Sequence, residues 1–544
     1  MLVSSAVRLR GFTRATLRAA HPRNDLRLQL RALTTSTHCR TEQLQSARSN
    51  SQPKTYSVPF AYLALGAAAG LAIGYFAYTQ PSTASSSTII VKYGSRDQVK
   101  TAIAELTTIF GAERVLTNPE AIYPYGYSDN SYHGGLARPV IPHVVNVARK
   151  FRVPLTVFSG GTSLEGHYGG HEAGSICIDM SRMDQIIEIH EKDSDLICQA
   201  GASWEHINEI LEEKGIPLFF PLDPGPGATI GGMIGTGCSG TNAVRYGTAK
   251  GEWFLNLTVV LPNGEVIKTR RRAHKSSAGF DLTKLFVGAE GTLGVITEAT
   301  LKLAPRLPTR VAIAQFPSVE HAVSAVQEIL HSDIGMTIRT SLTRHHKSYA
   351  LFLKIQGSDD MVKRVAAVVR KIVQKHGASG WDFGSSEEAA KDLWHARKSA
   401  LWSTLESLPN SRAWTTDVCV PPSNLPQLVK ETKEDLKAHN VKGTIVGHVG
   451  DGNFHAILLF RNDEELEAVR EAVHRMVHRA LRLDGTCTGE HGIGIGKKEY
   501  LVEELGPGTI ELMKTIKAAV DPLCIMNPGK LYPDEDTSWK SLSR

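Results

Sequence analysis

The sequence predicts an α+β protein whose body has two regions and is preceded by one transmembrane helix. Three observations lead to this prediction. Residues 58–78 form a stretch of 21 residues without a charge, a glycine-rich run of short apolar strands reaches Pro305, and helical patterns return after Ser318. The chain has 544 residues, of which 42% are hydrophobic and 21% charged. This composition is typical of a globular protein with more than one core, and it excludes a disordered chain or a single small binding module.

The first 57 residues are predicted to be a mitochondrial transit peptide and linker (1–57). Arg10, Arg14 and Arg18 lie on one face of a predicted helix, and no acidic residue precedes Asp25. Serine and threonine are frequent in the same segment. Amphipathic, Arg-rich, Ser-rich and acid-poor segments are typical of mitochondrial targeting, and a disordered basic tail is the alternative.

Residues 58–78 are long enough to cross a bilayer once as a helix. Tyrosines lie towards both ends of the segment, where aromatic rings favour the membrane interface. Together with the transit peptide, this segment predicts an anchor in the inner mitochondrial membrane, with the catalytic body facing the intermembrane space. Residues 79–125 are then expected to form a polar tether and an N-terminal helical region.

The distribution of charge argues against a nucleic-acid partner. Residues 1–54 contain ten of the 61 Lys and Arg residues and two of the 55 acidic residues, which leaves 51 basic and 53 acidic residues for the rest of the chain. The body is therefore nearly neutral. The seven cysteines form no CxxC pair, so we expect neither a disulfide framework nor a cysteine-based metal site.

Three glycine-rich loops predict a binding site for a long ligand that carries phosphate groups. The first follows an apolar strand and starts at Ser159, the second spans 221–247 and the third spans 288–294. Consecutive glycines let backbone N–H groups converge on an anion. The fingerprints of a Rossmann domain and of a P-loop are both absent from the sequence, so neither of these nucleotide-binding folds is expected.

The order of the motifs SGGTSLEGH, PLDPG to RYG and GAEGTLGVIT resembles the FAD-binding domain of the vanillyl-alcohol-oxidase or PCMH type. The resemblance implies that residues 126–308 hold FAD between two α+β subdomains. It also implies flavin contacts from each of the three loops. These contacts are Ser159, Gly160, Gly161, Thr162, Ser163, Gly166, Pro221, Gly231, Gly232, Thr236, Ser239, Glu290 and Ile296.

Two histidines flank a GDGN turn near the C-terminus, and a later loop contains a glutamate next to a third histidine. If the turn makes a hairpin, its strands bring His448 and His455 together. Glu490 completes a two-histidine, one-carboxylate set that suits a divalent metal, for which we expect Zn²⁺ or Mn²⁺. His491 is then free to act as the catalytic base. The alternative is that the two histidines only cap a hairpin.

The motifs HVGDGNFH, GTCTGEHGIG and NPGK, with LWHAR at 393–397, resemble the C-terminal domain of FAD-linked oxidases of D-2-hydroxy acids. The resemblance implies that residues 309–544 form a ferredoxin-like α+β cap and a helical C-terminal region, with a flavin contact at Asn527. It implies D-lactate as the substrate, with D-2-hydroxyglutarate and glycolate as alternatives, and cytochrome c as the electron acceptor. Arg397 would bind the substrate carboxylate, unless it is an ordinary surface arginine.

Two places depart from the family pattern. The segment around Pro139–Pro142 is shorter than the pattern requires, and so is the segment between Gly335 and Ser348. We interpret both as coding sequence missing from the gene prediction. They leave open a membrane-anchored flavin-binding protein without turnover, and a non-haem iron oxygenase with the same metal ligands is a third interpretation.

Overall fold

The computed structural model describes residues 92–126, 145–172, 174–335, 338–345, 348–384, 386, 389 and 400–534. The predicted transit peptide, the predicted membrane anchor at 58–78, Pro139–Pro142 and Arg397 lie outside the described residues. Within these described ranges, no helix has the length and apolar character needed to cross a membrane. The chain from Ile89 onward forms one compact unit.

Helices packed on two parallel strands form the first subdomain. Its first helix starts after Ser95, whose side chain accepts a hydrogen bond from the backbone of Gln98, while the Gln98 side chain accepts one from the backbone of Ser95. This reciprocal capping box fixes the helix start. The elements are α2 (Arg96–Phe110), η1 (Ala112–Arg114), α3 (Pro119–Ile122), η2 (Tyr123–Gly126), α4 (Val145–Phe151), β1 (Leu155–Phe158) and β2 (Ile176–Asp179).

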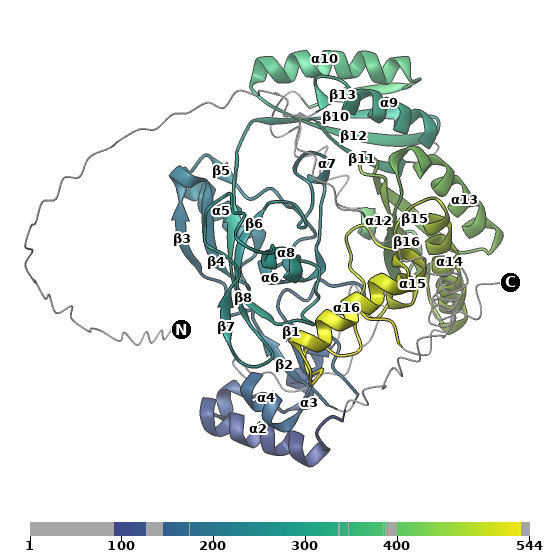
Figure 1. The fold of residues 1–544 in the computed structure, drawn as a ribbon. Helices are drawn as coiled ribbons and strands as arrows, with labels where there is room; N and C mark the ends of the chain where they lie inside the picture. The colour runs from purple at the N-terminus through teal and green to yellow at the C-terminus, as the bar shows by residue number, and fades with distance from the viewer. Residues whose placement is uncertain are drawn as a thin grey trace, which may run out of the picture. The chain divides into compact units, whose positions relative to one another are not determined.

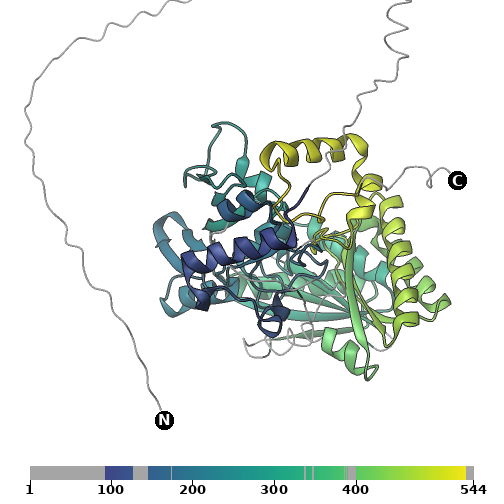
Figure 2. The same ribbon diagram turned by 90° about the horizontal axis from the view of Figure 1, so that it is seen from below.

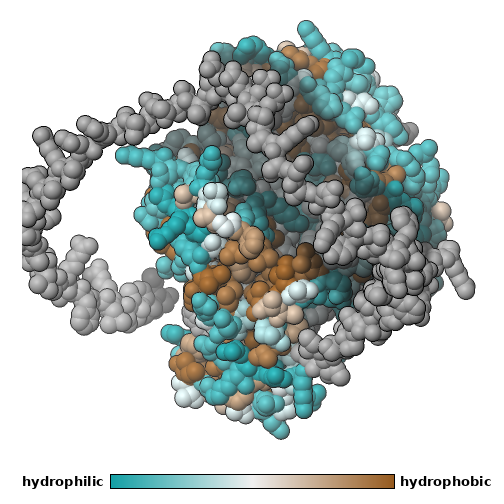
Figure 3. Space-filling view, viewed as in Figure 1, coloured by the Kyte–Doolittle hydropathy of each residue, from teal (hydrophilic) through white to brown (hydrophobic). Residues whose placement is uncertain are grey.

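A five-stranded antiparallel sheet forms the second subdomain. Its elements are β3 (Ile186–His190), η3 (Glu191–Asp193), β4 (Asp195–Gln199), α5 (Trp204–Glu213), β5 (Leu218–Phe219), α6 (Ile230–Thr236), α7 (Ala243–Tyr246), β6 (Phe254–Val260), β7 (Val266–Lys268), α8 (Leu282–Phe286), β8 (Val295–Lys302) and β9 (Ala304–Pro305). The strand order is β3-β4-β8-β6-β7. Figure 1 shows this sheet on the left and the first subdomain below it. Figure 3 shows the molecule from the same side as Figure 1. Apolar side chains gather near the middle of this view, with hydrophilic side chains around them.

A seven-stranded antiparallel sheet, the cap sheet, begins at Thr309, directly after the second subdomain. Its elements are β10 (Thr309–Phe316), α9 (Val319–His331), β11 (Ile338–His345), β12 (Ser348–Gln356), α10 (Asp359–Lys375), β13 (Gly380–Phe383), α12 (Ala400–Glu406), β14 (Arg412–Cys419), η5 (Pro422–Asn424), α13 (Leu425–Ala438), β15 (Lys442–His448), β16 (Asn453–Phe460) and α14 (Asp463–Arg482). The strand order is β13-β10-β12-β11-β15-β16-β14. The cap lies at the top and right of Figure 1.

The cap sheet contains a structural duplication. The order β10-α9-β11-β12-α10 is repeated as β14-α13-β15-β16-α14, and the halves join where β11 pairs antiparallel with β15. With β13 added, the first half has the β-α-β-β-α-β connectivity of a ferredoxin-like unit. The sequence shows no internal repeat. The duplication is therefore present only in the order of the elements and in the pattern of apolar residues.

One face of the cap sheet is covered by helices, and the other face carries the polar side chains of the site. Phe454 and Ala456 of β16 belong to the core beneath the helices. His455 lies between them and therefore points to the opposite face, because successive strand residues alternate. Asp417 of β14 is paired directly with His455, and His448 of β15 is paired with the start of β16. These three side chains consequently share one face.

After the cap, the chain returns to the first subdomain through η6 (Lys498–Tyr500), α15 (Leu501–Leu505) and α16 (Pro507–Val520). Leu155 of β1 forms a parallel bridge with Met526. Ile525 and Met526 are fully buried in the core of the first subdomain. The view from below shows the yellow C-terminal segment beside the purple and blue helices of that subdomain (Figure 2). The last part of the chain thus completes its first folded part.

Candidate active site

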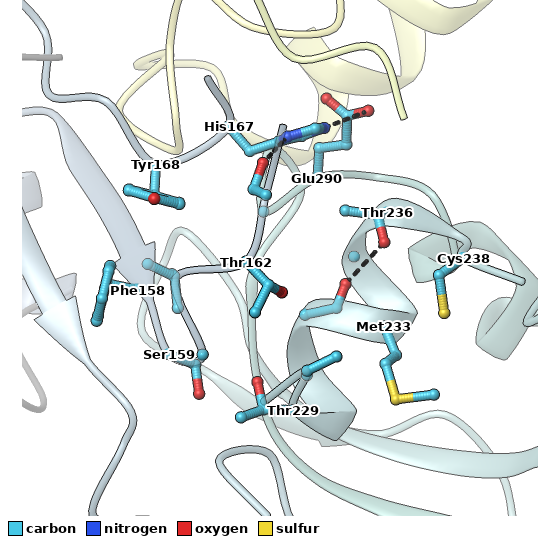
Figure 4. Close-up of a pocket in the computed structure, with 18 of the residues that line it drawn as sticks. Phe158, Ser159, Thr162, His167, Tyr168, Thr229, Met233, Thr236, Cys238 and Glu290 are labelled. Carbon is cyan, nitrogen blue, oxygen red and sulfur yellow. Dashed lines mark hydrogen bonds and ion pairs between the residues drawn. The ribbon is translucent and has the colours of Figure 1, made fainter. Parts of the chain in front are cut away.

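A cavity of about 350 Å³ lies between the glycine-rich loops and the later loop that carries Glu490 and His491. The loop after β1 forms one wall and the residues of α6 form another. Figure 4 shows Phe158 and Tyr168 on one side, Met233 and Thr236 on the other, and Thr162 between them. The three motifs predicted to bind one ligand therefore surround one cavity.

The cavity wall fits a long polar ligand. Ser159 Oγ and Thr229 Oγ1 are buried at this wall, and neither has a hydrogen-bond partner among the described residues. A buried hydroxyl without a partner is costly, so a bound group would be expected to satisfy it. At Gly160 any side chain would collide with the backbone, because a Cβ atom would lie 2.3 Å from the Gly227 carbonyl oxygen. Hydroxyls and bare backbone are the groups that a diphosphate such as that of FAD requires.

Most of the predicted flavin contacts line this cavity. They are Ser159, Gly160, Gly161, Thr162, Ser163, Gly231, Gly232, Thr236, Glu290, Ile296 and Asn527. Gly166, Pro221 and Ser239 do not line it. The Pro221 carbonyl accepts a hydrogen bond from Asn242 Nδ2 at 2.7 Å, and Ser239 donates to Glu490 Oε2 at 2.5 Å. The last two therefore hold neighbouring loops in place.

Glu290 also joins the flavin-binding half to the loop that carries the predicted base. Its carboxylate accepts hydrogen bonds from the backbone of Ile493 at 2.6 Å and Gly494 at 2.8 Å. Asn527 Nδ2 donates to the carbonyls of Glu290 at 2.7 Å and His167 at 2.9 Å. His167 Nε2 lies 3.2 Å from the Glu290 carboxylate (Figure 4). Burial opposes a charge on His167, but this carboxylate outweighs burial and raises the pKa of His167.

His448, His455 and Glu490 converge as predicted. His455 Nε2 lies 2.9 Å and His448 Nε2 3.5 Å from Glu490 Oε1. One ligand atom from each residue lies within 4.8 Å of the other two. Burial alone would raise the pKa of Glu490, but the two imidazoles hold it well below its ordinary value. Two imidazoles and an ionised carboxylate fit a divalent metal that keeps open positions for a substrate.

The GDGN hairpin predicted from the sequence is confirmed and explains this convergence. His448 pairs with Asn453, and His455 lies two residues further along β16, so the two imidazoles share a face with ring centroids 5.2 Å apart. Gly452 closes the turn with φ +76°, and a Cβ atom there would lie 1.9 Å from the Val420 carbonyl oxygen. Only glycine allows both this conformation and this approach.

Asp417 fixes the loop that carries Glu490. Its buried carboxylate accepts backbone hydrogen bonds from Gly489 and Glu490, each at 2.7 Å, and one from the Thr488 hydroxyl at 2.9 Å. Lys497 Nζ lies 2.7 Å away. Burial would raise the pKa of Asp417, but the neighbouring imidazole of His491 and the ammonium group of Lys497 outweigh it and hold the pKa well below its usual value. Asp417 is therefore ionised at neutral pH.

His491 lines the cavity beside this carboxylate. Its Nδ1 atom lies 3.3 Å from Asp417 Oδ1, and its ring stacks on that of His455 with centroids 5.1 Å apart. Burial lowers the pKa of His491, which favours the neutral imidazole. Because Nδ1 faces the carboxylate, Nε2 is the nitrogen available to a substrate.

A second group of possible metal ligands is already neutralised by a lysine. Glu165, Asp417 and His491 each have a ligand atom within 4.8 Å of the others. Lys497 Nζ lies 3.5 Å from Glu165 Oε1 and 2.7 Å from Asp417 Oδ1, and all of its side chain is buried. The ammonium group therefore supplies the cation at this cluster, and the predicted metal site remains the one at His448, His455 and Glu490.

Asp417 and Lys497 were not part of the site predicted from the sequence. One signal could have revealed Asp417, because an aspartate inside the apolar run WTTDVCV is unusual in a strand unless it is paired. Lys497 follows the GEHGIGIG loop in a position that resembles an ordinary surface lysine. Its burial depends on the packing of two distant segments.

Two family models match the chain. The first is described as FAD binding domain and matches residues 141–270, and the second is described as FAD linked oxidases, C-terminal domain, and matches residues 308–531. The mitochondrial D-lactate dehydrogenase (cytochrome) of Arabidopsis thaliana is 39% identical over 513 residues, which cover 86% of this chain and 89% of that protein. The mitochondrial D-lactate dehydrogenase (cytochrome) 1 of Saccharomyces cerevisiae is 42% identical over 417 residues, covering 72% of this chain and 70% of that protein.

The chain belongs to the D-lactate dehydrogenase (cytochrome) family of FAD-linked oxidases. A solved structure of 4-ethylphenol oxidase from Gulosibacter chungangensis has a TM-score of 0.65 at 18% identity and covers 81% of this chain and 99% of that one. At this identity the likeness shows the fold alone. The predicted PCMH-type flavin-binding fold and the predicted cofactor FAD are thus confirmed for this member of the D-lactate dehydrogenase family.

Proposed function

We propose that this protein oxidises D-lactate to pyruvate with FAD and passes the electrons to cytochrome c in mitochondria. The observation that carries the proposal is the convergence of His448, His455 and Glu490 next to His491 at the wall of the flavin-binding cavity. Family members that are about 40% identical are named for this activity. A flavin-binding protein without turnover would not need three metal ligands and a separate base.

Bound FAD supplies the acceptor for the substrate hydride. The residues that would hold it are the lining residues of the cavity, with Ser159 and Thr229 offering hydroxyls that no other described group satisfies. Glu490 and His491 line the same cavity. The reacting carbon of a bound hydroxy acid would therefore be placed between the flavin and these two residues.

A divalent metal, Zn²⁺ or Mn²⁺, is part of this proposal, with His448, His455 and Glu490 as its ligands. When bound, such a metal acts as a Lewis acid on the substrate hydroxyl. The low pKa of Glu490 keeps its carboxylate ready to bind a cation. The backbone N–H groups of Gly489 and Glu490 donate hydrogen bonds to Asp417. These bonds hold the Glu490 carboxylate in position before any ligand arrives.

His491 acts as the base that removes the hydroxyl proton. Nε2 of its neutral imidazole accepts this proton, and Asp417 orients the ring through Nδ1 and stabilises the imidazolium that forms. His491 is buried among protein groups, which limits exchange of the proton with bulk water. We assign the substrate carboxylate to Arg397, whose guanidinium suits bidentate binding.

The proposed location is the inner mitochondrial membrane, with the catalytic body in the intermembrane space. It is supported by the Arg-rich segment 1–57 and the uncharged segment 58–78. The relatives in plant and yeast are named mitochondrial. Cytochrome c as acceptor agrees with the absence of a CxxCH or iron–sulfur motif in the sequence, because the next electron carrier must then be a separate protein.

Stereospecific flavin reduction tests the proposal. The FAD-loaded protein is mixed without oxygen with D-lactate or L-lactate, and loss of the oxidised flavin absorbance is followed. We expect bleaching by D-lactate alone, a large loss of rate after treatment with a chelator, and recovery when Zn²⁺ or Mn²⁺ is returned. His491→Ala should slow the reduction by roughly 10²- to 10⁴-fold, as loss of a general base does.

His206 offers a matched control, because it is an exposed histidine on α5 whose side chain is 56% accessible. His206→Ala should reduce flavin at the rate of the unaltered protein. Equal bleaching by both enantiomers would contradict the proposal. Bleaching by D-2-hydroxyglutarate alone would keep the mechanism and change the substrate.

A further inference from the structure

His167 connects the wall of the flavin-binding cavity to the carboxylate of Glu290. Its side chain lines the cavity, and its Nδ1 atom forms a hydrogen bond with the hydroxyl of Ser163, which lines the same cavity. Its other ring nitrogen, Nε2, lies 3.2 Å from Glu290 Oε1 (Figure 4). The two side chains of this pair are 8% and 2% accessible. The proposed mechanism gives this buried histidine no role.

The hydrogens on Ser163, His167 and Glu290 can be arranged in two ways. Nε2 of the histidine carries a hydrogen in both, because the carboxylate beside it has none to give. If the imidazole is neutral, Nδ1 accepts the Ser163 hydrogen, and the hydroxyl oxygen can then only accept from a ligand. If the imidazole is protonated, Nδ1 donates to Ser163, and the hydroxyl is able to donate its own hydrogen into the cavity.

The wall of the cavity is poor in positive charge. FAD brings a diphosphate with two negative charges, and its oxygens accept hydrogen bonds without donating any. None of the described residues that line the cavity is a lysine or an arginine. Two lining residues, Glu290 and Glu490, have carboxyl groups, which oppose an anion. The two lining histidines are His167 and His491, and His491 is the proposed base.

We propose that His167 is protonated in the FAD complex, so that FAD binding takes up a proton from solvent and makes the Ser163 hydroxyl a donor to the diphosphate. The imidazolium then lies between the Glu290 carboxylate and the hydroxyl that faces the cofactor. His167 is in this sense a positioning residue for FAD. The inference builds on the flavin cavity of the proposed function, but it does not depend on which hydroxy acid is oxidised.

The charged groups around His167 favour its protonated form. Burial has the largest influence and lowers the pKa of His167, but the carboxylates of Glu290 and Glu165 outweigh it and raise the pKa. Lys530, from the C-terminal segment, acts in the opposite direction but more weakly. Its ammonium group donates a hydrogen bond to the carbonyl of Gly169.

The loop that carries the proposed base presents only backbone to His167. Gly492 packs so closely that a Cβ atom there would lie 2.7 Å from His167 Nε2. The titratable side chains of this loop have other partners: Glu490 contacts the imidazoles of the proposed metal site, and His491 faces Asp417. The loop therefore covers the pair of His167 and Glu290 without adding a charge that would oppose protonation.

Proton uptake during FAD binding tests this proposal. FAD is removed from the full-length protein and rebound, and the heat of binding is measured in two buffers that differ in their enthalpy of ionisation. The difference gives the number of protons taken up per FAD. Above the raised pKa of His167, between about pH 7 and 9, the FAD-free protein has lost this proton, and we expect an uptake approaching one. The affinity for FAD should fall by up to about tenfold per pH unit over the same range.

His167→Gln removes the titrating group but keeps a side chain that forms hydrogen bonds. This variant should take up no proton, and its affinity for FAD should be independent of pH in that range and roughly tenfold weaker at about pH 7. His206→Gln, on the exposed histidine of α5, should behave as the unaltered protein does. His491→Ala should keep the uptake, which separates His167 from the other histidine of the cavity.

The measurement on the unaltered protein needs no variant, so it decides the matter even if His167→Gln does not fold. The proposal is overturned if FAD binds without proton uptake throughout this range of pH. It is also overturned if a folded His167→Gln protein still takes up the proton. Neither measurement involves D-lactate, so a failure of the proposed substrate would remain distinguishable from a failure of this inference.

Discussion

Asp417 shows how one buried side chain supports the whole candidate site. It is fully buried, and its carboxylate accepts hydrogen bonds from Thr488, Gly489 and Glu490 as well as the ammonium group of Lys497. It therefore positions Glu490, the proposed metal ligand, and lies 3.3 Å from Nδ1 of His491, the proposed base. We regard Asp417 as a positioning residue.

Asp417→Asn should destabilise the protein by about 3–5 kcal/mol, because it leaves the buried charge of Lys497 without its main partner. Lys497→Met should destabilise the protein by a similar amount, because it leaves the buried charge of Asp417 without the ammonium group. The double variant should lose clearly less than the sum of the two, since the uncompensated charge is then absent. Urea unfolding measures all three values.

Asp97 provides the control for this cycle, because it is an exposed aspartate whose side chain is 89% accessible. Asp97→Asn should change the stability by less than about 0.5 kcal/mol. Strict additivity of the Asp417 and Lys497 variants would show that the two side chains are not coupled, and the positioning role would have to be abandoned.

Among the elements, the β15–β16 hairpin decides where the two histidines lie. Its turn contains Gly452, which has φ +76° and leaves no room for a Cβ atom against the Val420 carbonyl. Gly506 has the same φ of +76°, but a Cβ atom added there would meet no atom of the described residues within 4 Å. The two glycines therefore separate the effect of backbone strain from the effect of a collision.

Gly506→Ala should cost about 1–3 kcal/mol, which is the strain of a side chain at φ +76° and ψ 160°, a conformation essentially confined to glycine. Gly452→Ala should cost at least about 2 kcal/mol more, because the collision with Val420 forces the turn to move. It should also lower the metal content and the rate of flavin reduction. Equal losses of stability in the two variants would mean that the turn tolerates a side chain and that the close approach is unimportant.

Local elements were predictable where the periodicity was strong. Helical patterns at 322–330 and 360–375 correspond to α9 and α10, and the apolar strand at 350–355 corresponds to β12. The GDGN turn predicted the hairpin and the proximity of the two histidines. The pairing of β11 with β15, and hence the duplicated cap, was not predictable, because periodicity fixes the face of a strand but not its distant partner.

The candidate site was predictable to the same extent. The motifs revealed the residues whose chemistry is distinctive, namely the histidines and Glu490. They did not reveal that Glu290 uses its carboxylate to hold Ile493 and Gly494, or that Ser239 donates to Glu490. These contacts join segments that are distant along the chain, and only the folded protein brings them together.

At the scale of the whole molecule, the two halves are joined by the returning C-terminal segment. Ile525 and Met526 are buried in the core of the first subdomain, and the Leu155 backbone N–H donates to the Ile525 carbonyl at 2.7 Å. Asn527 of the same segment lines the flavin-binding cavity. The flavin-binding half is therefore incomplete without residues that lie beyond the cap.

Ending the chain after Asp521 should abolish retention of FAD. The loss removes two fully buried apolar side chains, each contributing about 1.5–3 kcal/mol, together with the backbone pairing to β1. The ratio of flavin to protein absorbance measures the effect. A chain that ends after Asp534 is the control and should retain FAD, whereas normal flavin content in the shorter chain would show that the returning segment is dispensable.

The return of the C-terminal segment to Leu155 also sets the order of events in biogenesis. A ribosome releases Leu155 long before it has made Ile525 and Met526, so the first subdomain leaves synthesis without part of its interior. We therefore expect FAD to be retained only by a polypeptide that already includes Ile525, Met526 and Asn527. A product that terminates before this segment should be empty of flavin, so that cofactor occupancy reports that translation has passed it.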